Sequence, residues 1–172
     1  MEELEISKKA IKGDDDAFLE VMQLYKESLL RAALAFLKDE DAAIEALQEV
    51  TYRAYKKIHT IKEPAYLKTW LTRIMINYCQ DQVKRSNRVI SDNQVYDISV
   101  YQDQSLIELK EALELLSNED QQLIYLKYFQ NTKIKEIAAM EKIPEGTVKS
   151  RLHKVLKTLR LYFKEKGESD HV

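Results

Sequence analysis

The chain has 172 residues, of which 45% are hydrophobic and 33% are charged, with a formal net charge of −2. This length suits one domain or two small ones, and three glycines and two prolines are too few for the turns of a β-sandwich or barrel. No apolar run is long enough to cross a bilayer, and Met1–Glu5 lacks the basic start of a signal peptide. The single cysteine, Cys79, cannot form an internal disulfide. The composition therefore predicts a cytoplasmic, all-α protein of two small helical domains.

Basic and acidic residues alternate in blocks along the chain. Residues 61–90 carry six Lys or Arg against two acids, and residues 121–172 carry eleven against six. Between them, residues 91–120 carry one basic residue against eight acids. Each block can be an ordinary solvated surface, but two basic blocks on helical patterns favour contact with a polyanion at two places.

The first 58 residues contain two amphipathic helical patterns. Asp14–Asp16 suit a helix N-terminus and precede an apolar stripe at helical spacing, formed by Phe18, Val21, Tyr25, Leu29, Ala32 and Phe36. After Lys38–Asp41 a second stripe follows, with Ile44, Leu47, Val50 or Thr51, Ala54 and Ile58. Its outer face would show Asp41, Glu45, Gln48, Glu49 and Arg53. This face is either simply solvated or a binding surface for a basic partner.

A third helix is predicted from about Ala65, after a short connection that ends at Pro64. Its apolar residues are Leu67, Trp70 or Leu71, Ile74 and Tyr78, and Trp70 is interpreted as a core anchor rather than a base-stacking residue. The helix ends in a basic run that contains Lys84, Arg85 and Arg88. Residues 89–104 lose the helical period and are the predicted linker, so the domains are expected at residues 1–88 and 105–172.

The second domain has the pattern of a helix-turn-helix. Its first apolar face is formed by Leu106, Leu109, Leu113 and Leu116, and a capping box at Ser117–Asp120 begins a helix with Leu123, Ile124, Leu126 and Phe129 inside. A short helix over residues 133–141 and a tight turn follow. The last helix should start with Pro144 in its first position. Its packed face is Val148, Leu152, Val155, Leu159 and Tyr162, while its Lys and Arg side chains point elsewhere.

No catalytic or cofactor-binding constellation is found in the sequence. The three histidines, His59, His153 and His171, are far apart, and Gly146 is isolated rather than part of a phosphate-binding loop. We therefore expect no enzyme activity, no cofactor and no metal site. His153 lies on the basic helix, where its imidazole either meets a base or phosphate or simply faces solvent.

Two segments resemble signatures of one protein family. Glu136–Ala138 followed by Ile143–Leu152 resembles the EIA…PxGTVKSRL signature in the −35-reading region of bacterial extracytoplasmic-function sigma factors of the sigma-70 type. Leu47–Val50 and Trp70–Asn77 resemble the family's polymerase-binding segment and its −10-reading helix. The resemblance covers residues 15–88 and 105–163, in the family's order.

The resemblance implies three sets of site residues. Core RNA polymerase would bind Asp41, Glu45, Gln48, Glu49 and Arg53. The melted −10 element, with one flipped base, would contact His59, Thr60, Ile61, Lys62, Arg73 and Asn77, and its phosphates would contact Lys84, Arg85 and Arg88. The −35 element would contact Thr147, Lys149, Ser150, Arg151, His153 and Lys154. An anti-sigma factor is a further expected partner.

Several positions depart from the family's pattern. Ala42–Glu45 stands where Asp-Ala-Glu-Asp is usual, which removes part of the acidic docking surface, and Ser117 replaces a proline. Lys133 stands where a serine usually caps the helix. Lys142 replaces the glycine of the helix-turn-helix, so we expect the turn to differ there or, if Lys142 is left-handed, to carry a strain of about 1 kcal/mol.

The sequence leaves two other functions open. A conventional helix-turn-helix regulator would use residues 15–88 for sensing or dimerisation and would bind DNA without polymerase. A helical adaptor would use the basic faces for protein contacts only. The main prediction is an alternative sigma factor, which joins core RNA polymerase and gives it promoter specificity.

Overall fold

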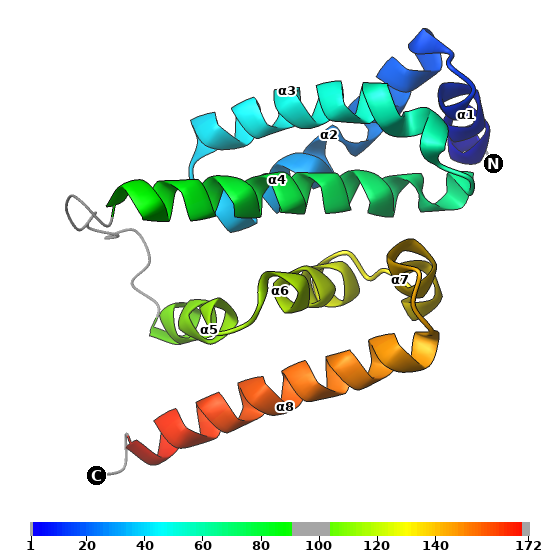
Figure 1. Cartoon of the computed structure of the whole chain (residues 1–172). Helices are drawn as coiled ribbons and strands as arrows, with labels where there is room; N and C mark the ends of the chain where they lie inside the picture. The colour runs from blue at the N-terminus through cyan, green and yellow to red at the C-terminus, as the bar shows by residue number, and fades with distance from the viewer. Residues whose placement is uncertain (1, 91–103, 170–172) are drawn as a thin grey trace. The chain divides into compact units, whose positions relative to one another are not determined.

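A computed structural model of the chain describes residues 2–90 and 104–169 (Figure 1). All regular structure in these ranges is helical and none of it is strand, which confirms the predicted all-α fold class. The chain divides into two compact units, Met1–Gln94 and Val95–Val172. Most of the predicted linker lies outside the described residues, and its first two residues, 89 and 90, belong to the last turn of a helix.

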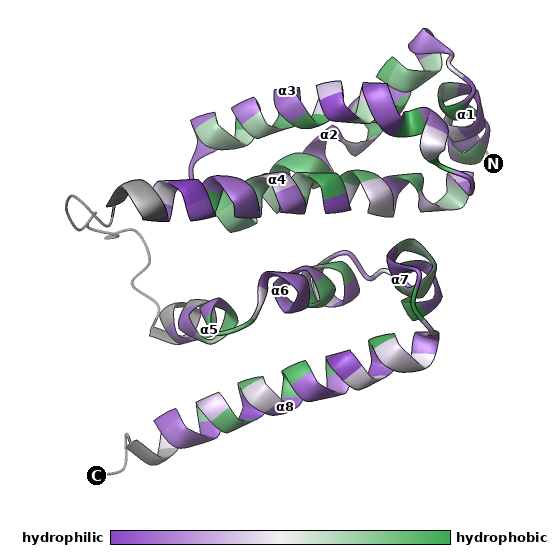
Figure 2. Cartoon of the chain, viewed as in Figure 1, coloured by the Kyte–Doolittle hydropathy of each residue, from purple (hydrophilic) through white to green (hydrophobic). Residues whose placement is uncertain are grey.

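The first unit is built from four helices and two short 3-10 turns. The helices are α1 (Glu2–Ile11), α2 (Asp15–Leu37), α3 (Glu40–Lys57) and α4 (Leu67–Ile90), and the turns are η1 (Ile58–Thr60) and η2 (Pro64–Tyr66). Helices α2, α3 and α4 pack on one another, and each carries both hydrophobic and hydrophilic residues (Figure 2). Helix α1 packs on α2 and against both turns, beside the connection between α3 and α4 (Figure 1).

Aspartates begin two of these helices, and the start at Asp14–Asp16 was predicted from the sequence. The Asp14 carboxylate accepts the Ala17 N–H at 2.9 Å, and the Asp39 carboxylate accepts the Ala42 N–H at 2.7 Å. Each bond satisfies a backbone donor that has no partner within its own helix. The local sequence therefore fixes where α2 and α3 start.

The buried face of α3 differs from the predicted one. Ala43, Ala46, Val50 and Ala54 are buried, whereas Ile44, predicted to be core, is 45% exposed. Small side chains let two helices approach closely, so the alanines take the contact positions against α2 and α4. The prediction for Ile44 was wrong because it placed this large apolar residue inward instead of the neighbouring alanines.

Helix α4 also buries residues that the sequence pattern missed. Leu67 and Leu71 are buried as predicted, and Met75, Ile76 and Cys79 are buried as well. Trp70, Ile74 and Tyr78 are half-buried. The predicted inward positions of Ile74 and Tyr78 are therefore only partly correct. Because α4 lies against both α2 and α3, its buried face is wider than a single stripe.

Helix α1 was not predicted as an element from the sequence. Its Ser7 and Ala10 are buried, and the Tyr25 hydroxyl of α2 donates a hydrogen bond to the Glu3 carboxylate. Burial and this hydrogen bond both raise the pKa of Tyr25 above its ordinary value. Gly13, with a φ of +96°, makes the tight turn into α2.

The second unit contains α5 (Gln104–Glu114), α6 (Asn118–Ile124), the π-helical turn η3 (Tyr125–Phe129), α7 (Ile134–Glu141) and α8 (Glu145–Ser169). Its core is formed by Leu116, Leu123, Ile124, Leu126, Ile137, Ala138, Val148, Leu152 and Val155. Phe129, predicted to be core, is 65% exposed, and Leu109 is 37% exposed. A π-turn inserts an extra residue into the helix, so the 3.6-residue pattern no longer places Phe129 on the buried face.

The helix-turn-helix consists of α7 and α8, with Lys142 between them. Lys142 adopts the left-handed conformation (φ 55°), and its N–H and that of Ile143 both donate to the Ala138 carbonyl. The Pro144 carbonyl accepts the N–H groups of Thr147 and Val148, at 3.0 and 3.3 Å. Pro144 therefore caps α8, which begins one residue later than predicted.

Replacing Lys142 by glycine should stabilise the second unit. Glycine adopts a positive φ without strain but loses more entropy on folding, so we expect a net gain of about 0.5–1 kcal/mol. Amide hydrogen exchange of α7 and α8 would measure it. Lys142→Ala, which keeps the Cβ atom, is the control and should give no gain in stability. Equal hydrogen-exchange protection in the glycine variant and the wild type would show that the left-handed Lys142 backbone carries no strain.

Candidate nucleic-acid interface

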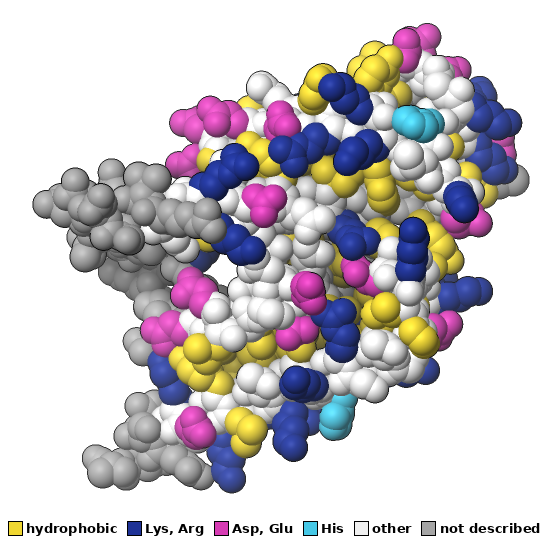
Figure 3. Space-filling view, viewed as in Figure 1, with side chains coloured by type: hydrophobic (Ala, Val, Ile, Leu, Met, Phe, Trp, Pro, Cys, Tyr) yellow, Lys and Arg dark blue, Asp and Glu magenta, His cyan; other side chains and the backbone are white. Residues whose placement is uncertain are grey.

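Helix α8 has one packed face and one exposed polar face. Val148, Leu152 and Val155 are almost fully buried, which confirms the first three positions of the predicted inward stripe, while Leu159 and Tyr162 are half-buried. Five of the six residues predicted to contact DNA are exposed on other faces of the helix: Thr147, Lys149, Ser150, His153 and Lys154. Lys and Arg side chains gather along α8 (Figure 3). No ion pair among the described residues involves Lys149 or Lys154, so both ammonium groups are available to phosphates or base edges.

The first turn of α8 adds backbone and hydroxyl groups to this surface. Thr147 lies in that turn, where backbone N–H groups and the helix dipole favour an anion. The Ser150 hydroxyl donates to the Gly146 carbonyl at 2.9 Å, so its oxygen keeps the capacity to accept a hydrogen bond.

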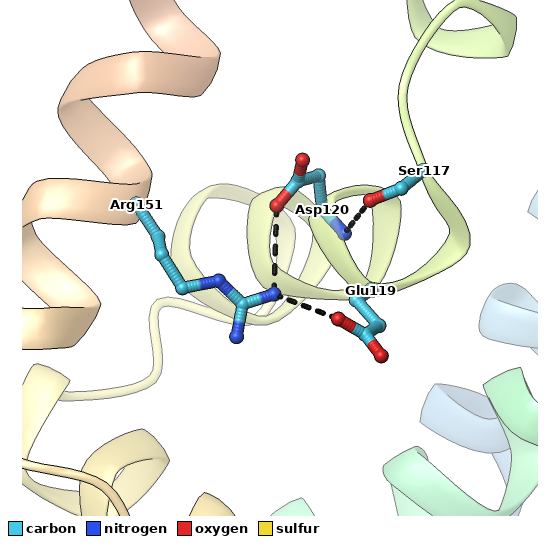
Figure 4. Close-up of polar contacts among 4 residues, drawn as sticks. All are labelled: Ser117, Glu119, Asp120 and Arg151. Atoms are coloured by element: carbon cyan, nitrogen blue, oxygen red, sulfur yellow. Dashed lines mark hydrogen bonds and ion pairs between the residues drawn. The ribbon is translucent and has the colours of Figure 1, made fainter.

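Arg151, the sixth predicted residue, lies in a different environment. Its guanidinium pairs with the carboxylates of Glu119, at 3.4 Å, and Asp120, at 3.5 Å, both on α6 (Figure 4). Its side chain is 32% exposed. The structure therefore separates Arg151 from the other two cations of the predicted site, Lys149 and Lys154.

The exposed cations of α8 continue beyond the predicted site. Lys157 and Arg160 are exposed, four and seven residues after His153, which places all three on one side of the helix. At 1.5 Å per residue, Lys149 and Lys157 are about 12 Å apart along the axis, close to the width of the DNA major groove. In the sequence, only the excess of basic residues along this helix indicated that Lys157 and Arg160 could extend the site.

In the first unit, the connection between α3 and α4 exposes most of its predicted site residues. His59, Thr60 and Lys62 are exposed and Ile61 is half-buried, while Ile58 anchors η1 in the core. The Ile61 N–H donates to the Ile58 carbonyl at 3.1 Å. Helix α1, which was not predicted from the sequence, packs against both η1 and η2 and so supports the connection.

Helix α4 continues this surface along the chain. Asn77 is exposed and Arg73, one turn earlier on the same side, is half-buried. Lys84 and Arg85 are exposed near the end of the helix, and Arg88 lies in its last turns. Along α4, the Arg73 guanidinium and the Asn77 amide therefore come first, and the basic run follows them.

The outer face of α3 combines exposed acids with an internal ion pair. Asp41, Glu45 and Gln48 are exposed at spacings of four and three, so they share one side. Glu49 instead accepts a bond from Arg53 at 2.7 Å, and the Arg53 guanidinium lies 5.0 Å from the centroid of the Tyr78 ring. This arrangement ties Arg53 to α4. Ile44 and Tyr52, both exposed, lie on the same side as Gln48.

No metal site is found among the described residues, and Cys79 is not an activated thiol. No group of three or more His, Cys, Asp or Glu in them could hold a metal ion. Cys79 is buried beside the Met75 sulfur, and burial raises the pKa of its thiol to about 12. Such a thiol stays protonated near neutral pH. Among the helices described, none is long and apolar enough to span a membrane.

Comparison with known proteins places both units in one family. The family model for sigma-70 region 2 matches residues 21–89, and the model for sigma-70 region 4 matches residues 106–159. The chain is 28% identical to the RNA polymerase sigma factor SigV of Bacillus subtilis over 144 residues, which cover 80% of this chain and 85% of SigV. It is 25% identical to the extracytoplasmic-function sigma factor SigW of the same species over 172 residues, covering 89% and 92%.

The chain belongs to the extracytoplasmic-function group of sigma-70 factors. This alternative sigma factor directs transcription initiation, and the region 2 match does not favour a conventional helix-turn-helix regulator. Its fold is similar to that of the sigma factor RpoE in a co-crystal structure with the anti-sigma factor NepR from Bartonella quintana. The TM-score is 0.62 and the sequence identity is 23%, covering 86% of this chain and 96% of that one.

The matched regions coincide with the surfaces described above. Region 2 spans most of α2 and the whole of α3, η1 and η2, and it ends in the last turn of α4. Region 4 includes α6 and α7 and ends within α8 at residue 159, so it contains all the predicted −35 residues. Helix α1 precedes the region 2 match.

Proposed function

We propose that this sigma factor reads the −35 element with the exposed face of α8. Lys149, Ser150, His153 and Lys154 would contact bases and phosphates in the major groove, and Thr147 would contact the DNA backbone. One observation carries this proposal: α8 buries one apolar stripe and exposes the unpaired ammonium groups of Lys149 and Lys154 on its other faces. Residues 105–172 would then form the −35-binding domain, joined to residues 1–88 by a linker at residues 89–104.

The −10 element would be held by the first domain. The connection from His59 to Lys62 would accept a flipped base of the melted −10 element, while Arg73 and Asn77 would contact neighbouring nucleotides. Lys84, Arg85 and Arg88 would neutralise phosphates. Extruding a base costs a few kcal/mol, so binding energy from the polymerase and from both promoter elements must offset it.

Core RNA polymerase would bind the outer face of α3. Asp41, Glu45, Gln48 and Glu49 present an acidic and polar surface that suits a basic partner, and Arg53 would join it through its pairing with Glu49. The exposed Ile44 and Tyr52 add apolar area to this face. Such a surface combines charge complementarity with an apolar contact, as protein interfaces do.

The protein would act without chemistry of its own, in the cytoplasm, as a specificity subunit. Because its net charge is −2, the protein is not attracted to duplex DNA at long range, so we expect the free protein to bind DNA weakly. Polymerase would hold the two domains at the promoter spacing. An anti-sigma factor is proposed as a regulatory partner because one is bound in the co-crystal structure of the similar RpoE.

Run-off transcription on a promoter library tests the function directly. Purified core polymerase should initiate at specific promoters only when this protein is added, while the protein alone should give no footprint. A footprint without polymerase would favour a conventional regulator. If no template supports initiation, the chain would be a helical adaptor whose basic faces bind proteins, and the proposal would fail.

Removal of Lys149 or Lys154 should weaken −35 binding by the holoenzyme. A lost base contact costs about 1–3 kcal/mol and relaxes the preference at one position, whereas a lost phosphate contact lowers the salt slope by about 0.9. Promoter affinity of Lys149→Ala and Lys154→Ala across salt concentrations and −35 sequences distinguishes these cases. Lys26→Ala on α2, an exposed site outside the second unit, is the charge-matched control; unchanged binding in both test variants would exclude this reading face.

Charge reversal at Glu49 should impair assembly with core polymerase while leaving the fold intact. Glu49→Lys removes an acid from the proposed docking face and places a like charge beside Arg53, which costs the helix only about 0.2–0.5 kcal/mol. Affinity for core polymerase and circular dichroism measure the two effects. Glu20→Lys on α2, also exposed, is the control. Normal association of the Glu49 variant would remove α3 from the docking assignment.

A further inference from the structure

The position of Arg151 on α8 sets it apart from the DNA-facing cations. It follows buried Val148 by three residues and precedes buried Val155 by four, so its side chain leaves the helix on the packed side. Lys149 and His153, in contrast, are exposed. The Arg151 side chain reaches along the protein surface to α6 rather than away from it.

The Arg151 guanidinium already has two anionic partners. Glu119 and Asp120 follow Ser117, whose hydroxyl accepts the Asp120 N–H at 3.2 Å and so fixes the start of α6 (Figure 4). The two carboxylates therefore come from a capped helix end, and both lie within ion-pair distance of one guanidinium nitrogen. A DNA phosphate that approached Arg151 would meet the Glu119 carboxylate, whose side chain is 84% exposed, and would be repelled by it.

We infer that Arg151 is a positioning residue that fastens α8 to the start of α6, and that it does not read the −35 element itself. The inference rests on the proposed −35 function of α8. Packing of Val148, Leu152 and Val155 holds the helix against the core, while the ion pairs join a point on its flank to α6. Together they fix the rotation of α8 about its axis, and with it the direction of Lys149, His153 and Lys154.

Neutralising the two carboxylates while keeping the arginine gives the sharpest test. A positioning role predicts that Glu119→Gln with Asp120→Asn weakens holoenzyme binding to the −35 element as much as Arg151→Ala does, by up to about fivefold. The loss should be uniform across −35 sequences, the salt slope should be unchanged, and combining all three substitutions should add nothing further. If Arg151 bound DNA, freeing it from the carboxylates would leave binding unchanged or strengthen it.

Charge reversal provides an independent readout. Arg151→Glu alone should weaken binding strongly, and adding Glu119→Arg and Asp120→Asn should restore the wild-type affinity to within about twofold, because the ion pair is rebuilt in reverse. Glu119→Arg with Asp120→Asn on the wild-type Arg151 background measures any new phosphate contact made by the introduced arginine. A glutamate at position 151 could not replace a DNA-contacting arginine, so absence of rescue would overturn the inference.

Lys149→Ala, measured in parallel, separates this inference from the function on which it rests. If Lys149→Ala changes −35 preference or salt slope and Arg151→Ala does so too, the positioning role is wrong and the −35 function stands. If neither variant changes binding, the reading face itself fails, and the role of Arg151 fails with it. Circular dichroism and hydrogen exchange of α8 confirm that each variant is folded before it is scored.

Discussion

The exposed polar face of α8 depends on the burial of the opposite face. Val148, Leu152 and Val155 enter the core formed with α6 and α7, and burying such a side chain contributes about 1.5–3 kcal/mol. A partly exposed ion pair contributes about 0–1 kcal/mol. Packing therefore decides where α8 lies, and its cations remain outside because a charge without a partner is costly to bury. The charged contacts refine an orientation that hydrophobic burial has already selected.

The same principle shapes the first unit, with small residues in place of large ones. Ala43, Ala46 and Ala54 fill the contact positions of α3, which turns Ile44 and Tyr52 outward onto the face that also carries Gln48. A close helix contact thus creates an exposed surface with both acids and apolar groups. The connection that follows α3 is supported by α1, so the surfaces proposed to bind polymerase and the −10 element share one helical framework.

Promoter recognition by a slightly acidic protein requires local rather than global attraction. The basic residues lie on two separate units, and the acids of residues 91–120 fall between them in the sequence. In the proposed function each surface would neutralise only a few phosphates, so neither would provide the affinity of a dedicated DNA-binding protein. This division fits the proposed function, in which the polymerase would supply both the remaining affinity and the spacing between the two contacts.

The sequence by itself determined the helical class, the helix starts at Asp14–Asp16 and Ser117, and the first three positions of the inward stripe of α8. These features depend on residues within a few positions of one another, where capping and periodicity act. The tertiary structure alone decided that Ile44 faces outward, that a π-turn exposes Phe129, and that α1 supports the connection between α3 and α4. It also paired Arg151 with carboxylates more than thirty residues away along the chain. A periodic pattern shows that a helix has a buried face, but the identity of its neighbours depends on how distant segments pack.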